Sequence, residues 1–142
     1  MTLEMPQAAF EFTLFALCNW REARGELLTT KQAQAWSVKN RVLNPRWWGG
    51  ASYSSVILMP WQYSSFNHND PNAVKWPVES DPSWQDSMDA VSAVLDGTLP
   101  DPTHGSVSYF DMSMDSDPPS WALSPEFAWA CDFGRLHFYK LA

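Results

Sequence analysis

The sequence predicts an α+β fold that is mainly helical and ends in a small antiparallel sheet. Apolar residues recur at helical spacing in three stretches before residue 97, whereas the stretches after residue 105 have the short, aromatic-rich character of strands. Helices that come first and strands that come last are typical of segregated α+β architectures. At 142 residues the chain has the size of one domain, and we expect residues 1–142 to share a single core.

The composition argues against several broad classes of protein. Apolar residues make up 45% of the chain and charged residues only 18%, whereas disordered chains combine low hydrophobicity with high net charge. With 9 Lys and Arg against 16 Asp and Glu, the net charge is −7, which argues against binding to a nucleic-acid backbone. No apolar run approaches the length that spans a membrane. We therefore expect neither nucleic acid nor a membrane as a partner.

Two helices are expected near the N-terminus. The first is predicted over residues 8–24, because apolar side chains recur about three residues apart, and it should end at Gly25. The second is predicted over Lys31–Leu43, with Thr29 or Thr30 as its N-cap and an Asn-Pro dipeptide after its last residue. A short connection would then place the two helices side by side.

A long segment, residues 46–82, follows and is rich in Gly, Ser, Asn, Pro and Trp. We expect irregular surface structure with short turns, and loops of this length are commonly functional. The best-defined helix comes next, with Asp81 as N-cap, Pro82 at its first position and Gly97 as its stop. Its apolar face should comprise Trp84, Met88, Val91 and Leu95.

Three short strands are predicted after the prolines that follow this helix. They cover residues 106–110, 127–131 and 136–139, and residues 132–135 form a hairpin turn between the last two. In the last strand His137 alternates with apolar neighbours, so it should lie on the opposite face from them.

The end of the first helix gathers charges next to an apolar run. Glu22 and Glu26 are four residues apart and would share one face if the helix continued. Such clusters are commonly solvated ion pairs worth about a few tenths of a kcal/mol each. Alternatively, a glutamate that emerges from a core helix beside a Trp-rich loop is partly desolvated. Its pKa then rises, and it stays protonated as the general acid that glycosidic bond cleavage requires.

Five motifs occur in an order that resembles one protein family. They are Glu22-Ala23-Arg24-Gly25-Glu26, Asn40-Arg41-Val42, Gln62-Tyr63-Ser64, Asp101-Pro102-Thr103-His104-Gly105 and Gly134-Arg135-Leu136-His137-Phe138-Tyr139. The chain is similar to the cell-wall hydrolase family typified by the spore-cortex-lytic enzyme SleB. That family carries E-A-R-G-E, N-R-V, Q-F-S, T-x-G-A and G-x-H-x-F-Y in the same order. The chain departs from this pattern at Tyr63, at His104 and in an insert over residues 46–60.

The resemblance implies a lysozyme-like fold and a lytic transglycosylase that cleaves the MurNAc-GlcNAc β-1,4 bond of peptidoglycan without a cofactor. It implies that Glu22 acts first as acid and then as base. The same residue protonates the leaving oxygen, and the 6-hydroxyl of the substrate closes an anhydro ring, so no second carboxylate is needed. Glu26 is a secondary candidate for this role, and we expect it rather to support the loop or bind substrate.

Candidate substrate-binding residues follow from the same picture. Sugar rings have apolar faces that stack on indole, and Trp47, Trp48, Trp61 and Trp76 lie in the irregular segment, although packing alone also explains a tryptophan. Trp84 and Trp129 are predicted at core positions instead. The complete candidate set is Trp47, Trp48, Trp61, Gln62, Tyr63, Ser64, His104, Tyr109 and His137.

Two other chemistries have weaker support. A zinc site would draw on His68, His104 and His137 with Asp70 or Asp101, but the close helical spacing of zinc ligands is missing, and we expect no metal. A cysteine peptidase would need Cys18 or Cys131 with His137. Cys18 lies in an apolar helical run, however, and we expect both cysteines to be reduced, buried thiols, with a single long-range disulfide between them as the alternative.

Several functional alternatives stay open at this point. The chain is expected to be a peptidoglycan-degrading enzyme, but a hydrolytic muramidase, an N-acetylmuramoyl-L-alanine amidase or a non-catalytic peptidoglycan-binding module would share many of these features. The first six residues lack the basic region of a secretory signal. We expect a monomer made in the cytoplasm that acts in the periplasm or on the wall, either as a phage-type endolysin or as an injected effector with an immunity protein.

Overall fold

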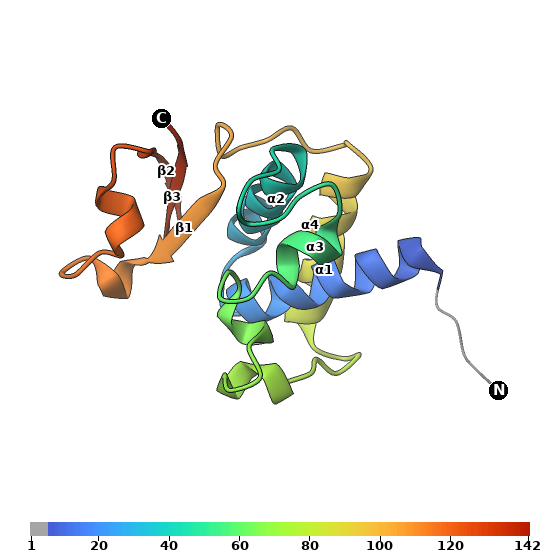
Figure 1. The fold of residues 1–142 in the computed structure, drawn as a ribbon. Coiled ribbons are helices and arrows are strands. Elements are labelled where there is room, and N and C mark those ends of the chain that lie inside the picture. Colours follow the sequence, from blue (N-terminus) through green and yellow to red (C-terminus); the bar gives the residue numbers. More distant parts are fainter. Residues whose placement is uncertain (1–5) are drawn as a thin grey trace.

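The computed structural model describes residues 6–142, and it confirms the predicted α+β class. A helical part and a strand part lie side by side, with the sheet at one side of the helices (Figure 1). The helices are α1 (Gln7–Ala23), α2 (Leu28–Leu43), α3 (Tyr53–Ile57) and α4 (Pro82–Leu95), and the strands are β1 (Ser108–Asp111), β2 (Phe127–Phe133) and β3 (Leu136–Leu141).

The main core lies where α1, α2 and α4 pack against one another, and α3 completes it by packing against α1 and α2. Phe15 of α1 is fully buried there and stacks on Tyr53 of α3. The other fully buried apolar residues of this core include Ala16, Cys18, Ala35, Val38, Val56, Ile57, Val91 and Val94. The apolar spacing of the first helix therefore predicted its buried face correctly.

The second helix begins earlier than predicted. α2 starts at Leu28, and neither Thr29 nor Thr30 caps it, since the residue before it has extended backbone and no side-chain cap is formed. The first turn of α2 also makes a tertiary contact with the chain after α1. Buried Lys31 extends its ammonium group to the carbonyl oxygens of Arg24 and Glu26, at 3.1 and 2.6 Å, and so satisfies carbonyl groups just beyond the end of α1.

The long segment of residues 46–82 is more regular than expected. It contains α3 and two short 3-10 helices, η1 (Ser64–Phe66) and η2 (Pro71–Val74). The buried guanidinium of Arg21 anchors the second half of the segment from α1. It donates to the carbonyl oxygens of Ser65, Ala73 and Lys75 at 3.3, 3.1 and 3.2 Å. One long-range arginine thus orders a stretch whose local composition indicates only turns.

The start of the last helix, α4, is formed as predicted. Asp81 Oδ1 accepts the backbone N–H of Ser83 at 2.9 Å, Pro82 occupies the first position, and Gly97 after the helix has a φ of +77°. On its apolar face Val91 is fully buried, while Leu95 is exposed. Local chemistry specifies this helix start, which explains why it was predictable, and Trp20 of α1 adds a hydrogen bond from its indole N–H to Asp81 Oδ2 at 3.0 Å.

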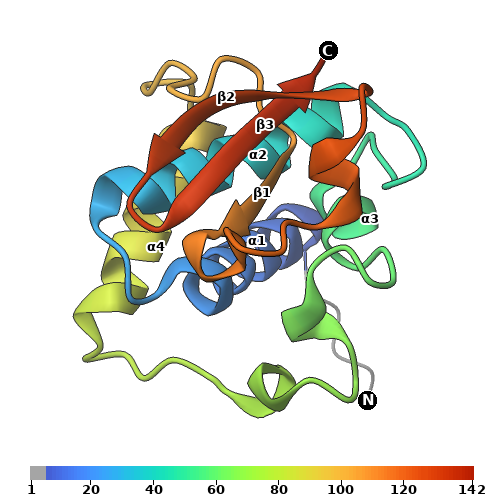
Figure 2. The same cartoon turned by 90° about the vertical axis from the view of Figure 1, so that its left-hand side faces the viewer.

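The sheet has the order β1-β3-β2, so the last strand of the chain lies in the middle. Figure 2 shows it lying across α2, and Leu136 and Phe138 pack there against Ala33. The hairpin turn is shorter than predicted: β2 runs on to Phe133, and only Gly134 and Arg135 separate it from β3. Gly134 has the positive φ, +53°, that such two-residue turns need.

The chain between β1 and β2 covers the other face of the sheet and contains the 3-10 helices η3 (Met112–Met114) and η4 (Ser120–Leu123). Trp121 of η4 packs edge-on against Phe127 and Tyr139. Trp129, predicted in the core, is 57% exposed instead. A bulge between Trp129 and Cys131 interrupts the pairing of β2 just after it, so simple alternation does not describe this strand.

Candidate active site

Glu22 lies in the last turn of α1, where that helix meets β1. Its Oε1 atom accepts a hydrogen bond from the hydroxyl of Tyr109 at 2.8 Å. The residues of α1 that precede it, from Leu14 to Arg21, are all buried, so the helix brings the carboxyl group from the core to the edge of the fold. The Glu22 side chain itself is partly buried. This is the partly desolvated position that a general acid requires.

Burial raises the pKa of Glu22 above its usual value, because the charged form loses its hydration. The hydrogen bond from Tyr109 has the opposite effect, since it stabilises the carboxylate. The negative charge of Asp70 raises the pKa further, and the positive charge of Arg41 lowers it. The net effect favours the protonated carboxyl more than in an exposed glutamate.

Glu26 has a different environment from Glu22. α1 ends at Ala23, so the helical spacing that would have placed both carboxylates on one face does not apply. Glu26 Oε1 instead accepts the backbone N–H of Arg135 at 3.3 Å, and its carboxyl group fills the space where a side chain at Gly134 would have to lie. Glu26 therefore supports the hairpin turn between β2 and β3.

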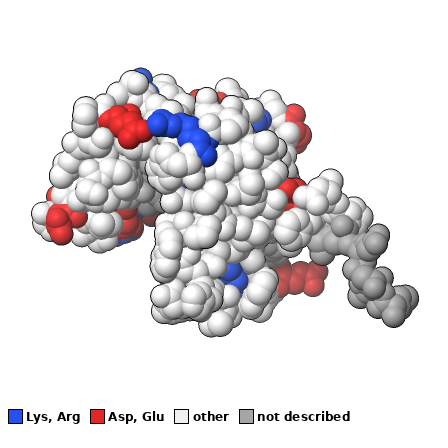
Figure 3. Space-filling view, viewed as in Figure 1, with Lys and Arg blue, Asp and Glu red and all other residues white. Residues whose placement is uncertain are grey.

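A cavity of about 190 Å³ lies between the helical part and the strand part. Figure 3 shows a hollow between these two parts, in a surface that is mostly uncharged. The residues that line the cavity are Arg41, Trp47, Trp61, Gln62, Ser108, Tyr109, Trp121 and Phe127. Tyr109 both lines the cavity and donates to Glu22, so the carboxyl group lies beside it. Aromatic walls with a few polar groups suit a ligand that has apolar faces and hydroxyl groups.

Arg41 holds the two sides of the cavity together. Its buried guanidinium donates to Gln62 Oε1 at 3.1 Å, to Ser108 Oγ at 3.0 Å and to the carbonyl oxygen of Val107. It also lies over the rings of Trp48 and Tyr63. One side chain of α2 thus fixes the positions of polar groups from the segment of residues 46–82 and from β1.

Residues 25–139, which are most of the chain, match the family model described as Cell Wall Hydrolase. The chain belongs to the cell wall hydrolase family. Two solved structures have the same fold: the catalytic domain of the germination-specific lytic transglycosylase SleB from Bacillus anthracis and that of SleB from Bacillus cereus. The first has a TM-score of 0.69 and 22% identity over 99% of this chain and 100% of the other. The second has a TM-score of 0.68 and 22% identity over 97% and 95%.

No curated protein sequence matches this cell wall hydrolase. The match to the family model begins at Gly25, three residues after Glu22, so the placement of Glu22 rests on the geometry of the structure. Family membership supports degradation of peptidoglycan as the activity. None of the helices in residues 6–142 is both long and apolar enough to cross a bilayer.

The tryptophans predicted for the cleft of the hydrolase divide into two kinds. Trp61 and Trp47 line the cavity and expose 71% and 56% of their surface. Trp48, next in the chain to Trp47, is 0% exposed and packs with Val107 and Phe127, so it offers no face to a sugar. The prediction that Trp48 contacts substrate is therefore corrected: Trp48 belongs to the core and packs against the cavity residue Phe127.

Several other candidate residues lie outside the cavity lining. Tyr63 is buried under Arg41 rather than exposed to substrate, and Ser64 begins η1. Exposed His104 has a φ of +58° in the tight loop before β1, and Asp101 organises that loop. Trp76 is exposed and stacks against the guanidinium of Arg21 instead of lining the cavity.

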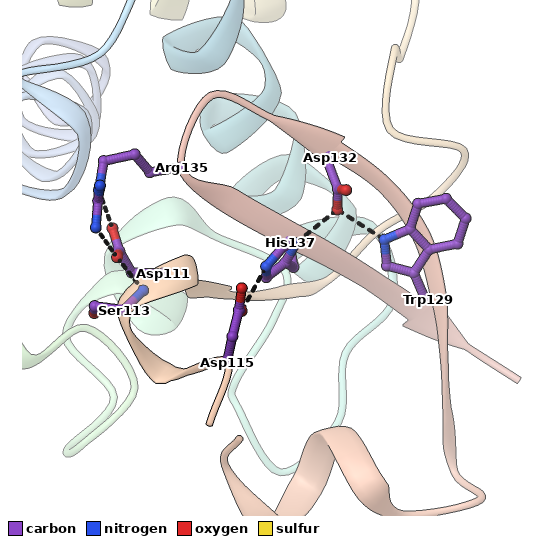
Figure 4. A network of polar contacts seen from close by, with 7 residues as sticks. All are labelled: Asp111, Ser113, Asp115, Trp129, Asp132, Arg135 and His137. Carbon is purple, nitrogen blue, oxygen red and sulfur yellow. Dashed lines mark hydrogen bonds and ion pairs between the residues drawn. The ribbon is translucent and has the colours of Figure 1, made fainter. Parts of the chain in front are cut away.

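His137 lies in a polar network at the sheet (Figure 4). Its Nδ1 and Nε2 atoms lie 2.8 Å from Asp132 Oδ1 and 2.7 Å from Asp115 Oδ1. Trp129 donates its indole N–H to the same oxygen of Asp132 at 2.8 Å. As predicted, His137 faces away from Leu136 and Phe138, but it joins the loop after β1 to β2 and is not part of the cavity lining.

Sequence reasoning missed four residues of the cavity: Arg41, Ser108, Trp121 and Phe127. Arg41 carried a usable signal, because it belongs to the N-R-V motif and is an arginine on a buried helix face. Trp121 and Phe127 carried none, since their approach to Trp61 depends on how the loop after β1 folds back over the sheet.

The arrangement of His, Cys, Asp and Glu side chains in the described residues supports neither the zinc site nor the cysteine peptidase. Within residues 6–142 no group of three or more His, Cys, Asp and Glu side chains is arranged to hold a metal ion. Cys18 and Cys131 are both free; Cys18 is buried as predicted, whereas Cys131 is only partly buried. Burial raises the pKa of the Cys18 thiol well above its usual value, so it is not a reactive thiolate.

Proposed function

We propose that this hydrolase is a lytic transglycosylase that cleaves the MurNAc-GlcNAc β-1,4 bond with Glu22 as its acid and base. The observation that carries the proposal is the position of Glu22: a partly buried carboxyl, bonded to Tyr109, beside an aromatic cavity. The raised pKa of Glu22 provides the protonated form that must begin the reaction. Glu26, which is engaged with the hairpin turn, has no comparable access.

The reaction then has two proton transfers at one residue. Protonated Glu22 donates its proton to the glycosidic oxygen, the C1–O bond of MurNAc breaks, and positive charge develops at C1. The Glu22 carboxylate next removes the proton of the MurNAc 6-hydroxyl, whose oxygen bonds to C1 and closes the 1,6-anhydro ring. The hydroxyl of Tyr109 stabilises the carboxylate between the two steps.

Glu22 lies beside the cavity through its hydrogen bond with Tyr109, and no carboxyl group of residues 6–142 lines the cavity itself, which favours a nucleophile supplied by the substrate over simple hydrolysis. Among the described residues, the lining contains one charged side chain, Arg41, and no aspartate or glutamate. Inverting and retaining glycosidases both use a pair of carboxyl groups that flank the bond. An internal nucleophile, the 6-hydroxyl, requires only one.

The cavity walls provide the means to hold a glycan strand. Trp61 and Trp47 on one side and Trp121 on the other present aromatic surface for the apolar faces of the sugar rings. Gln62 and Ser108 offer polar groups to the sugar hydroxyls, and Arg41 keeps both in place. Affinity comes from this cavity, because a net charge of −7 gives no attraction to an anionic wall.

The test is mass spectrometry of the soluble products released from purified sacculi by the wild type, by Glu22→Gln and by Glu26→Gln. Muropeptides with an anhydro-muramic end, made by the wild type and Glu26→Gln but not by Glu22→Gln, are expected. Reducing-end products would instead mean a hydrolytic muramidase, and freed stem peptides an amidase. Sacculus binding without any soluble product would mean a binding module.

A further inference from the structure

Three side chains form a hydrogen-bonded chain that ends on Glu22. Asn19 Nδ2 donates to the carbonyl oxygen of Lys31 at 2.8 Å and to Gln34 Oε1 at 2.6 Å. Gln34 Nε2 then donates to the Tyr109 hydroxyl oxygen at 3.3 Å, and that hydroxyl donates to Glu22 Oε1 at 2.8 Å. Asn19 and Gln34 have no exposed surface. The chain therefore crosses the interior from α1 through α2 to β1 and returns to α1.

The direction of every donor in this chain follows from one backbone group. A carbonyl oxygen only accepts, so the atom of Asn19 that faces Lys31 must be its amide nitrogen. The same nitrogen faces Gln34, which must therefore present its oxygen and turn its own nitrogen toward Tyr109. The Tyr109 oxygen accepts that proton, and its single hydroxyl proton is left for Glu22.

We propose that Asn19 and Gln34 are positioning residues that hold the hydroxyl proton of Tyr109 on Glu22 and thereby lower the pH at which Glu22 changes charge. The proposal rests on the proposed function only in treating Glu22 as the acid. Neither residue lines the cavity, so neither is expected to contact substrate.

Two further observations support this role. Asn19 Oδ1 is buried without a hydrogen-bond partner in residues 6–142, a cost to stability that an apolar side chain would avoid. A buried amide kept at such a cost is expected where its orientation matters. In addition, burial raises the pKa of Tyr109 well above its usual value, so its hydroxyl remains a donor while Glu22 titrates.

Other ionisable groups also act on Glu22, and the test must leave them unchanged. They are Cys18 on α1, Arg41 on α2, Tyr63 and Asp70 in the segment of residues 46–82, and Tyr109 on β1. Substitutions at Asn19 or Gln34 leave all five residues in place, although Gln34 also contacts Cys18 Sγ at 3.9 Å. Burial raises the pKa values of Cys18 and Tyr109 well above their usual values, so both stay protonated while Glu22 titrates, and a changed titration of Glu22 reports on the amide pair.

The expected direction follows from what Gln34 does to the hydroxyl. Its N–H draws electron density from the Tyr109 oxygen and makes the hydroxyl a stronger donor to the Glu22 carboxylate. Without Gln34 the carboxylate is less stabilised, and Glu22 loses its proton only at a higher pH. In Gln34→Glu an ionised carboxylate would compete for the same hydroxyl proton, and its charge would oppose that of Glu22, so the shift is larger.

The experiment is a ¹³C NMR titration of the Glu22 carboxyl in the full chain. The wild type is compared with Gln34→Met, with the paired variant Asn19→Leu/Gln34→Met and with Gln34→Glu. We expect the midpoint to rise by roughly 0.2–0.5 pH unit in the first two variants and by more in Gln34→Glu. The paired variant removes both amides together and leaves neither one unpaired, which preserves the fold.

Activity on sacculi gives the second measurement. The basic limb of the pH profile of kcat should move to higher pH together with the NMR midpoint, while KM stays the same. Any one of these variants that folds is sufficient for the test. The proposal would be overturned if the titration midpoint of Glu22 stayed at the wild-type pH. It would also be overturned if activity fell while the basic limb of the kcat profile stayed at the same pH. A wild type that releases no product would refute the proposed function, and the NMR titration would still test the chain.

Discussion

The polar chain from Asn19 to Glu22 runs through the interior, whereas the network around His137 lies at the surface of the sheet. Their hydrogen bonds have comparable lengths, 2.6–3.3 Å in the first and 2.7–2.8 Å in the second. In the interior, however, water does not compete for the donors, so each bond acts on the charge of Glu22. At the surface, solvent screens Asp115 and Asp132, which are more than half exposed. Burial, rather than the length of the hydrogen bonds, distinguishes the network at Glu22 from the network at the surface.

The largest expected effect comes from changing one carboxyl to an amide in each network. Glu22→Gln keeps the shape of the side chain but removes the proton donor, so we expect kcat on sacculi to fall by about 10²–10⁴-fold. Asp132→Asn is the matched change at the surface, and we expect it to alter kcat less than about twofold. Comparable losses in both variants would show that the surface network also serves the reaction.

The exposed tryptophans allow a second matched pair. Trp61 lines the cavity and Trp129 does not, although both expose more than half of their surface. Loss of one aromatic stacking partner is expected to raise KM in Trp61→Ala by roughly two- to tenfold. Trp129→Ala should leave KM unchanged. Steady-state release of soluble muropeptides measures both, and equal values of KM would remove Trp61 from the binding surface.

A smaller effect, in pH rather than rate, is expected from Tyr109→Phe. The Tyr109 hydrogen bond stabilises the Glu22 carboxylate and so lowers its pKa against the effect of burial. Without that bond the basic limb of the kcat profile should move up by roughly half to one pH unit. A limb that moves down, or stays in place while activity falls, would mean that the hydroxyl has another role.

Local sequence chemistry predicted the helical elements well and the tertiary contacts poorly. α4 was predictable because Asp81 caps the helix, Pro82 fits its first position and an apolar helical periodicity follows them. The start of α2 was not, because no side chain caps it: the residue before it is Leu27, whose carbonyl oxygen accepts the N–H groups of Thr30 and Lys31. Glu22 was also selected from local features, namely its place at the end of an apolar helix and the Glu-Ala-Arg-Gly-Glu motif.

The support around that carboxyl had no signal in the sequence. Asn19 and Gln34 lie on different helices, and their contact appears only when α1 and α2 pack. Trp47 and Trp48 are neighbours with opposite exposure, and no periodicity in an irregular segment distinguishes them. The family could therefore be predicted from the sequence, whereas the residues that surround Glu22 could be found only in the packed fold.

The smallest effect is expected at His137, and it concerns stability rather than activity. The hydrogen bond to Asp132, together with that to Asp115 and the charges of both aspartates, raises the pKa of His137 despite the opposing effect of its partial burial. A folded-state pKa above the unfolded value means that the protonated imidazole stabilises the fold. This contribution is complete below the unfolded value of about 6.5 and is lost as the pH rises through the folded value.

Urea unfolding of the wild type and His137→Gln across this pH range measures that contribution. The difference in the free energy of unfolding should be largest near pH 5, stay below about 1 kcal/mol because both aspartates are exposed, and shrink as the pH rises above the folded-state pKa. The glutamine retains some hydrogen bonding but no charge, so a difference that persists at high pH would mean that packing against Phe110, and not the ion pairs, holds the imidazole in place.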